Sequence, residues 1–284
     1  MASRIAPGDV TRLFKLPVSA LSALSAATGY LAWAREASWG LLGVFASVLL
    51  LACSASALNE AQEHDRDALM ERTRSRPIPA GKLSPRAALA VAAVVGITGL
   101  AWLSLTGGAT PALLGALAVA LYNAIYTPLK RITAFAVVPG ALVGGVAPAI
   151  GWAVAGGSLW DGRLLALCFF WLMWQVPHFS LLLARSSVEY ALARFPTLRD
   201  FFSDSQLARV TFVWIVGTAA SALLIPIFGV CGSPWAGIAL AAAGAVLCLF
   251  TWRALAHRAF DGAFRAMSAY ALVVIAVLVA DALL

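Results

Sequence analysis

The sequence predicts an all-α integral membrane protein, a bundle of nine transmembrane helices whose N-terminus lies in the cytoplasm. The first observation is composition: 62% of the 284 residues are hydrophobic and 12% are charged, whereas soluble domains are about half apolar and about a quarter charged. The second is that apolar runs last about 20 residues, the length of a membrane-crossing helix, without the alternation of a membrane β-barrel. The third is that basic residues gather between alternate runs.

The apolar runs give the expected helices in chain order. We expect spans at residues 16–34, 39–58, 86–106, 110–127, 134–155, 163–184, 208–230, 235–253 and 266–284. Several connections are short and glycine-rich, and two are long and polar, at about 59–85 and 185–207. The chain is therefore predicted to form a single membrane domain, 1–284, with two main polar loops.

The placement of Lys and Arg predicts the orientation. With the N-terminus in the cytoplasm, all of the 20 Lys and Arg residues except Arg35 and Arg163 fall in cytoplasmic segments, as the positive-inside rule expects. The net charge of +7 accordingly indicates orientation and contact with membrane lipids. We expect no nucleic-acid partner.

The first polar loop carries a candidate metal site. Asn59, Glu63 and Asp67 are spaced i, i+4, i+8, so they share one side of the second helix if that helix continues past the membrane surface. Two carboxylates and an amide suit Mg²⁺, which usually takes one or two carboxylates together with substrate phosphates and water.

Arginines follow these acids closely in the sequence. Arg72, Arg74 and Arg76 carry the planar guanidinium that suits phosphate oxygens. Acids for a metal beside arginines for phosphate predict a diphosphate-binding site. The alternative is a solvated loop whose arginines only fix the topology and touch anionic lipid.

Three blocks of sequence between roughly Lys15 and Gln206 resemble the UbiA superfamily of intramembrane prenyltransferases, and within it most closely the protoheme IX farnesyltransferases. The blocks are Asn59-x₃-Glu63-x₃-Asp67 with Met70-x-Arg72-Thr73-x₂-Arg76-Pro77 and Gly81; Tyr126-Thr127-Pro128-Leu129-Lys130-Arg131-x-Thr133 with Gly140, Gly144, Pro148, Ile150, Gly151 and Trp152; and Trp174-Gln175-x-Pro177-His178-Phe179.

The resemblance implies a nine-helix bundle of UbiA type in the inner (plasma) membrane, with the two polar loops as cytoplasmic active-site loops. It also implies Mg²⁺-dependent transfer of the farnesyl group of farnesyl diphosphate to a vinyl group of haem b, which gives haem O. Asn59, Glu63 and Asp67 would hold Mg²⁺ and act in catalysis, while the diphosphate would be bound by Arg72, Arg76 and Lys130.

Three alternatives stay open at this point. The first is an enzyme of the same superfamily that prenylates another acceptor, such as a quinone precursor or another aromatic compound. The second is a transporter, for which inverted repeats or helices broken at mid-membrane would be expected. The third is a non-catalytic membrane protein with a binding or assembly role.

Two features depart from the family pattern. Glu63 stands where the family normally has Asp. In the second polar loop the family usually has consecutive acids before a tyrosine, whereas here only Glu189 precedes Tyr190, and Arg194 replaces the expected Gly. Glu189 and Tyr190 are still expected to contact substrate, and Glu189 is a further candidate Mg²⁺ ligand. Asp200 and Asp204 also have i, i+4 spacing, although a solvated loop is the favoured interpretation there.

Other polar residues lie near the ends of the fourth and sixth spans. Tyr126, with Asn123 before it, is expected to line the cavity, and Lys130 and Arg131 to contact the diphosphate or the haem propionates or else only to anchor the helix. Gln175 and His178 belong to the expected acceptor pocket.

His178 is a candidate ligand of the haem iron, the alternative being a histidine bonded to carbonyls that Pro177 leaves free. Gly140 and Gly144 have the spacing of a helix-packing motif and are expected to allow close packing within the bundle. A dimer face is the alternative, so the oligomeric state stays open.

Overall fold

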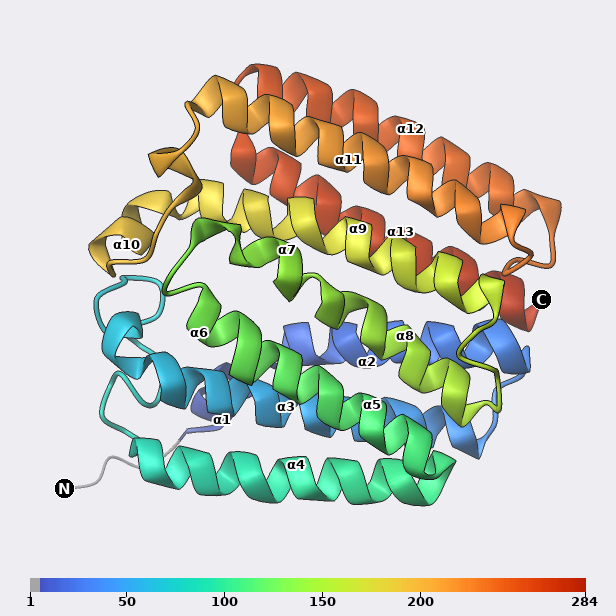
Figure 1. Ribbon diagram of the computed structural model, residues 1–284, viewed down its shortest axis with the longest axis horizontal. Coiled ribbons are helices and arrows are strands. Elements are labelled where there is room, and N and C mark those ends of the chain that lie inside the picture. Colours follow the sequence, from blue (N-terminus) through green and yellow to red (C-terminus); the bar gives the residue numbers. More distant parts are fainter. Residues whose placement is uncertain (1–5) are drawn as a thin grey trace.

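The structure is a computed structural model that describes residues 6–284, and this part of the chain is helical without strands (Figure 1). Eight segments are long and apolar enough to cross a membrane. They are α3 (Trp39–Asp67), α4 (Pro85–Gly107), α5 to α6 (Ala109–Leu129), η2 to α8 (Ala134–Val154), α9 (Gly162–Arg185), α11 (Asp204–Ile227), α12 (Pro234–Ala256) and α13 (Phe260–Leu283). The prediction of an all-α multi-pass membrane protein is confirmed.

The first expected span forms helix α2, which runs from Leu16 to Ala34 as predicted. It is not among the eight segments, because its three serines, together with Pro17, Tyr30 and Trp33, lower its mean hydropathy. The count of nine spans and the orientation of the N-terminus therefore stay predictions. Three short helical segments lie outside the spans: α1 (Pro7–Leu13), α10 (Ser187–Leu192) and η3 (Leu198–Asp200).

Helix starts are set by local capping. Ser38 accepts a hydrogen bond from the backbone N–H of Gly40 at the start of α3, and Ser84 accepts one from Ala87 at the start of α4. Asp161 caps α9 in the same way. Such side-chain acceptors satisfy N–H groups that the first helical turn leaves free. Helix α3 thus begins at a capped position and runs unbroken to Asp67.

The helices form a ring around an internal space. Contacts link α2 to α3, α3 to α4, α4 to α5, α5 to α8, α8 to α9, α9 to α13 and α13 back to α2, while α11 and α12 pack outside α9 and α13 (Figure 1). We call the end where α3 finishes the Asp67 end; the connection 68–84 and α10 lie there. The opposite end, where α2 finishes, is the Arg35 end.

Helices α2 and α8 touch closely only toward the Arg35 end. A Cβ atom on Gly29 would overlap the backbone of Pro148, and a Cβ on Gly151 would overlap the backbone of Ala26. Only glycine permits this approach of two helix backbones. Nearer the Asp67 end, both helices instead line a shared cavity, so the pair opens toward the end that carries the acidic residues.

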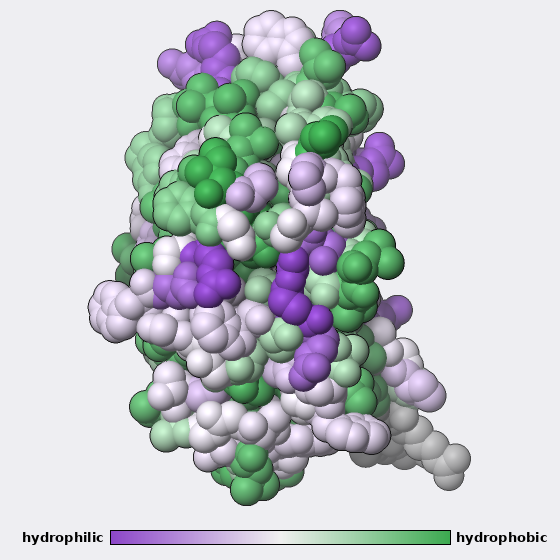
Figure 2. Space-filling view, turned by 90° about the vertical axis from the view of Figure 1, so that its right-hand side faces the viewer, coloured by the Kyte–Doolittle hydropathy of each residue, from purple (hydrophilic) through white to green (hydrophobic). Residues whose placement is uncertain are grey.

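The two basic residues outside the expected cytoplasmic segments are both held by specific contacts at the Arg35 end. Arg35 donates to Asp281 at 2.7 Å, and Arg163 pairs with Asp161 at 2.7 Å while its guanidinium lies over Trp33 and Trp152. Figure 2 views this end and shows small hydrophilic patches among mostly pale and apolar residues. These residues therefore tie helix ends together in a part of the surface with few charges.

Candidate active site

The structure brings Asn59, Glu63 and Asp67 together at the end of α3. Because α3 has 29 residues, it is about 43 Å long, which exceeds the roughly 30 Å thickness of the hydrocarbon core. Its last turns therefore carry the i, i+4, i+8 positions on one continuous helix. All three side chains are buried against the bundle, with exposed fractions of 2%, 3% and 2%.

Each of these three residues contacts a basic side chain from another segment. The Lys15 ammonium, just before α2, donates to Asn59 Oδ1 at 2.6 Å. Lys130 pairs with Glu63 Oε2 at 2.6 Å.

In the same group, Arg76 pairs with Asp67 Oδ2 at 2.5 Å. Its guanidinium is largely covered, with 17% of the side chain exposed. Arg76 and Lys130 thus lie where the sequence expects diphosphate ligands, and the structure adds Lys15 to the group.

The donor set fits a magnesium ion. Glu63 Oε1 is buried and has no hydrogen-bond partner among the described residues, whereas buried carboxylate oxygens are normally paired. The group offers two carboxylates and one amide oxygen, and within residues 6–284 no cluster of three or more His, Cys, Asp or Glu side chains suits a metal. A site with only two acids matches the usual Mg²⁺ arrangement, in which phosphates and water complete the shell.

A widened helical turn supports this group. Residues Leu121–Tyr126 form the π-helical segment η1, between α5 (Ala109–Ala120) and α6 (Thr127–Leu129). Thr127 Oγ1 accepts a hydrogen bond from the Asn59 amide at 3.1 Å and donates to the Tyr122 carbonyl at 2.9 Å. Such π turns are frequent at functional sites, and this one carries Tyr122, Asn123 and Tyr126.

Arg72 lies away from this group and forms a second one with the 185–207 loop. Its backbone N–H donates to Glu189 Oε1 at 3.2 Å, and its guanidinium lies 3.7 Å from Glu189 Oε2. Tyr190 packs on Phe195. The described contacts of Glu189 are therefore with Arg72 and not with Asn59, Glu63 or Asp67.

Arg131 also faces outward. It bonds the Gln62 carbonyl and lies 3.3 Å from Asp65, whose side chain is 56% exposed. Arg74 pairs with Glu71 on the surface, where their side chains are 65% and 81% exposed. The structure therefore separates these two arginines from the buried group at the end of α3.

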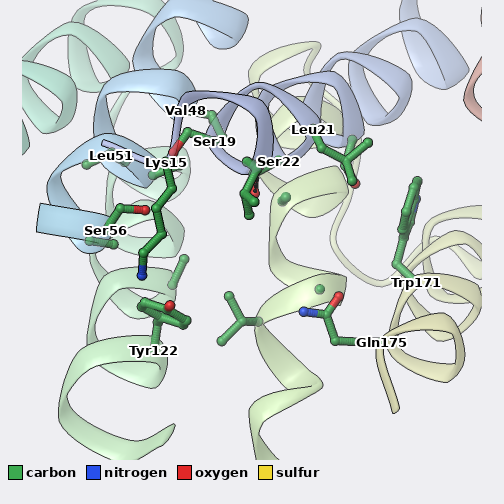
Figure 3. A pocket seen from close by; sticks show the side chains of 18 of the residues that line it. Lys15, Ser19, Leu21, Ser22, Val48, Leu51, Ser56, Tyr122, Trp171 and Gln175 are labelled. Carbon is green, nitrogen blue, oxygen red and sulfur yellow. Dashed lines mark hydrogen bonds between the residues drawn. The ribbon is translucent and has the colours of Figure 1, made fainter. Parts of the chain in front are cut away.

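A cavity of about 400 Å³ opens beside Lys15 and runs between α2, α3, α8, α9 and α13. In Figure 3 the Lys15 side chain points toward the ring of Tyr122, and Gln175 extends from α9 toward the interior. Most of the wall is apolar. Such a cavity, about the size of ordinary small-molecule sites, suits a hydrocarbon chain.

Only some of the residues that the sequence leads us to expect around the cavity line it. Gln175 and His178 line the cavity, as does Tyr122, whereas Asn123 and Tyr126 do not. Asn123 donates to the Ala55 carbonyl at 3.0 Å. Tyr126 stacks on Phe179 with ring centroids 5.4 Å apart.

Several polar atoms on the cavity wall lack partners. The His178 ring stacks on Trp174 and is tilted against Phe264, with ring centroids at 4.4 and 4.8 Å respectively. Its Nδ1 is buried without a hydrogen bond among the described residues, as are Trp171 Nε1 and Ser25 Oγ. The bond from His178 to a carbonyl freed by Pro177 is therefore not seen for Nδ1. Unpaired buried polar atoms indicate a polar ligand or water.

The surroundings of the two lysines shift their pKa values in opposite directions. Burial lowers the pKa of Lys15 to about 7, and the charges of Arg76 and Lys130 act in the same direction. For Lys130, burial acts to lower the pKa, but the Glu63 carboxylate outweighs it and holds the pKa above its usual value. Lys130 is therefore a firmly charged member of the group.

The structure thus places a buried group of two carboxylates, one amide and three basic side chains beside an apolar cavity between the helices. The sequence matches the model of the UbiA prenyltransferase family over residues 16–276. The chain therefore belongs to the UbiA prenyltransferase family, and it is a prenyltransferase embedded in the membrane.

Two protoheme IX farnesyltransferases are similar in sequence to most of this chain. The chain is 40% identical over 226 residues to the protoheme IX farnesyltransferase of Geobacter sulfurreducens, covering 78% of this chain and 83% of that protein. It is 36% identical over 232 residues to the protoheme IX farnesyltransferase of Oleidesulfovibrio alaskensis, covering 82% of each. Both relatives are named for farnesyl transfer to protoheme IX.

Solved structures support the fold. A UbiA homolog from Aeropyrum pernix aligns with a TM-score of 0.74 at 18% identity, covering 94% of this chain and 98% of that one. A homolog from Archaeoglobus fulgidus, solved with GPP and Mg²⁺, aligns with a TM-score of 0.67 at 16% identity, covering 94% and 99%. The UbiA-type helical bundle expected from the sequence is thereby confirmed.

Proposed function

We propose that this protein transfers the farnesyl group of farnesyl diphosphate to a vinyl group of haem b, with Mg²⁺, and so makes haem O in the inner (plasma) membrane. The observation that carries the proposal is the buried group of Asn59, Glu63 and Asp67 with three basic side chains, at the mouth of an apolar cavity of about 400 Å³. The named relatives supply the substrate pair.

The side chains at the end of α3 bind the head group. Glu63 and Asp67 with the amide oxygen of Asn59 would hold Mg²⁺, which supplies Lewis-acid stabilisation of the departing diphosphate. Arg76 and Lys130 each lie within 2.6 Å of a carboxylate of this group, so their charges are in reach of diphosphate oxygens. Preorganised cations that meet developing negative charge lower the barrier to bond cleavage.

The cavity holds the reacting carbon away from water. The C1–O bond of farnesyl diphosphate breaks, and the diphosphate leaves with the electron pair. Tyr122 and Trp174 line the cavity, and their aromatic rings stabilise the allylic cation. The terminal carbon of the vinyl group then bonds to C1, water adds to the cation left beside the porphyrin ring, and a proton is released.

His178 and Gln175 are the proposed contacts of the acceptor. Both line the cavity, and the unpaired Nδ1 of His178 is available to the porphyrin or its iron. The proposed substrate contacts of Arg72 and Glu189 require a rearrangement, because these two residues pair with each other here. Arg131 would likewise have to leave Gln62 and Asp65. Tyr190, next to Glu189, is a further proposed substrate contact. Tyr126 supports the wall through its stacking on Phe179.

The test is an assay of the purified protein in lipid nanodiscs with haem b, farnesyl diphosphate and Mg²⁺. We expect haem O, identified by chromatography and mass spectrometry, and no product after chelation of the metal. A protein that instead prenylates a quinone precursor, and leaves haem b unchanged, would overturn the assignment of the acceptor. A protein that releases no diphosphate with any acceptor would favour a binding or assembly role.

A further inference from the structure

Lys15 has an unusual backbone conformation immediately before α2. Its φ of 44° and ψ of 47° lie in the left-handed region, which side-chain-bearing residues seldom adopt. Its carbonyl accepts hydrogen bonds from Val18 at 2.9 Å and Ser19 at 3.1 Å, which start the helix. Strained conformations of this kind are concentrated at functional sites, and here the conformation directs an ammonium group into the bundle.

The ammonium of Lys15 contacts the one atom of Asn59 that can bind a metal. The Asn59 amide nitrogen donates to Glu63 at 2.9 Å and to Thr127 at 3.1 Å. These bonds fix the orientation of the amide, so Oδ1 faces Lys15 at 2.6 Å. A divalent ion and Lys15 therefore compete for the same oxygen.

Lys15 differs from the other two cations in its partner. Lys130 and Arg76 pair with the carboxylates of Glu63 and Asp67. Among the described residues no carboxylate pairs with Lys15 at salt-bridge distance, and its hydrogen bond is to the neutral amide of Asn59, so Glu63 and Asp67 act on it only from farther away. Lys15 also lines the cavity, with its amine near Tyr122 (Figure 3). A largely enclosed ammonium without an anionic partner gains most from an incoming anion.

We propose that Lys15 binds the diphosphate directly and couples its binding to that of the metal. When a diphosphate oxygen takes the ammonium of Lys15, Asn59 Oδ1 becomes free for the divalent ion. The inference rests on the proposed function, because it assumes that metal and diphosphate meet at the end of α3. Coupling of this kind is reciprocal, so each ligand strengthens the binding of the other.

The coupling gives Lys15 two opposite effects. A divalent ion without diphosphate has to displace Lys15 from Asn59 and also meets the charges of Arg76 and Lys130, so it binds weakly. A metal–diphosphate complex instead gains the charge of Lys15. Removal of the ammonium should therefore strengthen the binding of the divalent ion alone and weaken the binding of the metal–diphosphate complex.

The experiment measures the binding of Mn²⁺, in place of Mg²⁺, by electron paramagnetic resonance of the purified protein, once with Mn²⁺ alone and once with its preformed complex with inorganic diphosphate. In Lys15→Met we expect Mn²⁺ alone to bind about tenfold more tightly and the complex about tenfold more weakly, the size of one charged hydrogen bond. Arg265→Met is the matched control, because it removes one positive charge from an exposed pair with Asp261; both affinities should stay unchanged.

Other outcomes separate the inference from the proposed function. If Lys15→Met weakens both affinities, or changes neither, Lys15 has only a structural role and the inference is wrong. If the wild-type protein does not bind the Mn²⁺–diphosphate complex, the proposed site itself fails. Lys15→Gln, which keeps a donor for Asn59 without the charge, replaces Lys15→Met if that variant does not insert. Lys15→Gln should also weaken the binding of the Mn²⁺–diphosphate complex about tenfold.

Discussion

The substitution Asp67→Asn tests the role of the buried carboxylate most simply, because it removes one charge and keeps the shape. Asp67 is 2% exposed, and its Oδ2 lies 2.5 Å from Arg76. Two unit charges about 4 Å apart interact by about 4 kcal/mol at an effective dielectric constant of about 20. A metal ion held at this carboxylate would lose stabilisation of the same order.

We therefore expect kcat/KM of Asp67→Asn to fall by about 100- to 1000-fold. The assay is release of diphosphate from farnesyl diphosphate in nanodiscs, with elution volume in gel filtration and thermal unfolding as checks on folding. Asp65→Asn is the matched control, since Asp65 is two residues away on the same helix, 56% exposed and 3.3 Å from Arg131. Exposed pairs contribute about 0 to 1 kcal/mol, so its activity should change little.

A folded Asp67→Asn protein as active as Asp65→Asn would refute the reasoning. In that case neither the burial of Asp67 nor its pairing with Arg76 would matter for turnover. The metal assignment would have to be abandoned together with the proposed chemistry at the end of α3.

Three further predictions concern other parts of the molecule. Glu189→Gln should lower kcat/KM much less than loss of an α3 acid, because Glu189 faces Arg72 in a partly exposed pair; a loss of 100-fold or more would instead make it a metal ligand. Gly151→Ala should destabilise the protein by roughly 1–3 kcal/mol in thermal unfolding, because the new methyl group overlaps the α2 backbone. Gly8→Ala is the control and should be neutral, because its methyl group meets no neighbour. Equal unfolding temperatures of the two variants would contradict this prediction. Asp281→Asn should cost about 3 kcal/mol, because the buried carboxylate holds Arg35 and the 232–233 backbone; an unchanged unfolding temperature would show that this contact does not matter.

The elements that the sequence predicts well are those decided by local pattern. Apolar runs of bilayer length became helices, and the spacing of Asn59, Glu63 and Asp67 put them on one side of α3. Both follow from the 3.6-residue period of a helix, which needs no knowledge of the partner. The positions of Arg76 and Lys130 beside these residues also agree with their predicted role.

Contacts between distant segments could not be predicted in the same way. Lys15 and Asn59 are 44 residues apart, and the sequence around Lys15 gives no sign of a left-handed backbone. The π turn at Leu121–Tyr126 turns Tyr122, and not Tyr126, toward the cavity. The 3.6-residue period of a regular α-helix cannot predict that change of register, because a π turn has a different period and forms where it packs against α3.

The second polar loop is another contact that the sequence could not predict. Its sequence alone leaves open whether Glu189 serves a metal or a salt bridge. The structure places Glu189 against Arg72, which depends on how the 68–84 connection folds over the end of the bundle. Arginines that look equivalent in the sequence therefore take different partners, with Arg76 largely covered beside Asp67 and Arg72 exposed beside Glu189.

The most direct test is an X-ray structure with Mn²⁺ and a non-reactive thio analogue of farnesyl diphosphate, in which anomalous scattering locates the metal. We expect the peak between Asn59, Glu63 and Asp67, with the diphosphate beside Arg76 and Lys130 and the hydrocarbon chain in the cavity. A peak elsewhere, for example at Glu189 or in the 198–204 segment, with the α3 group still paired as it is here, would contradict the account.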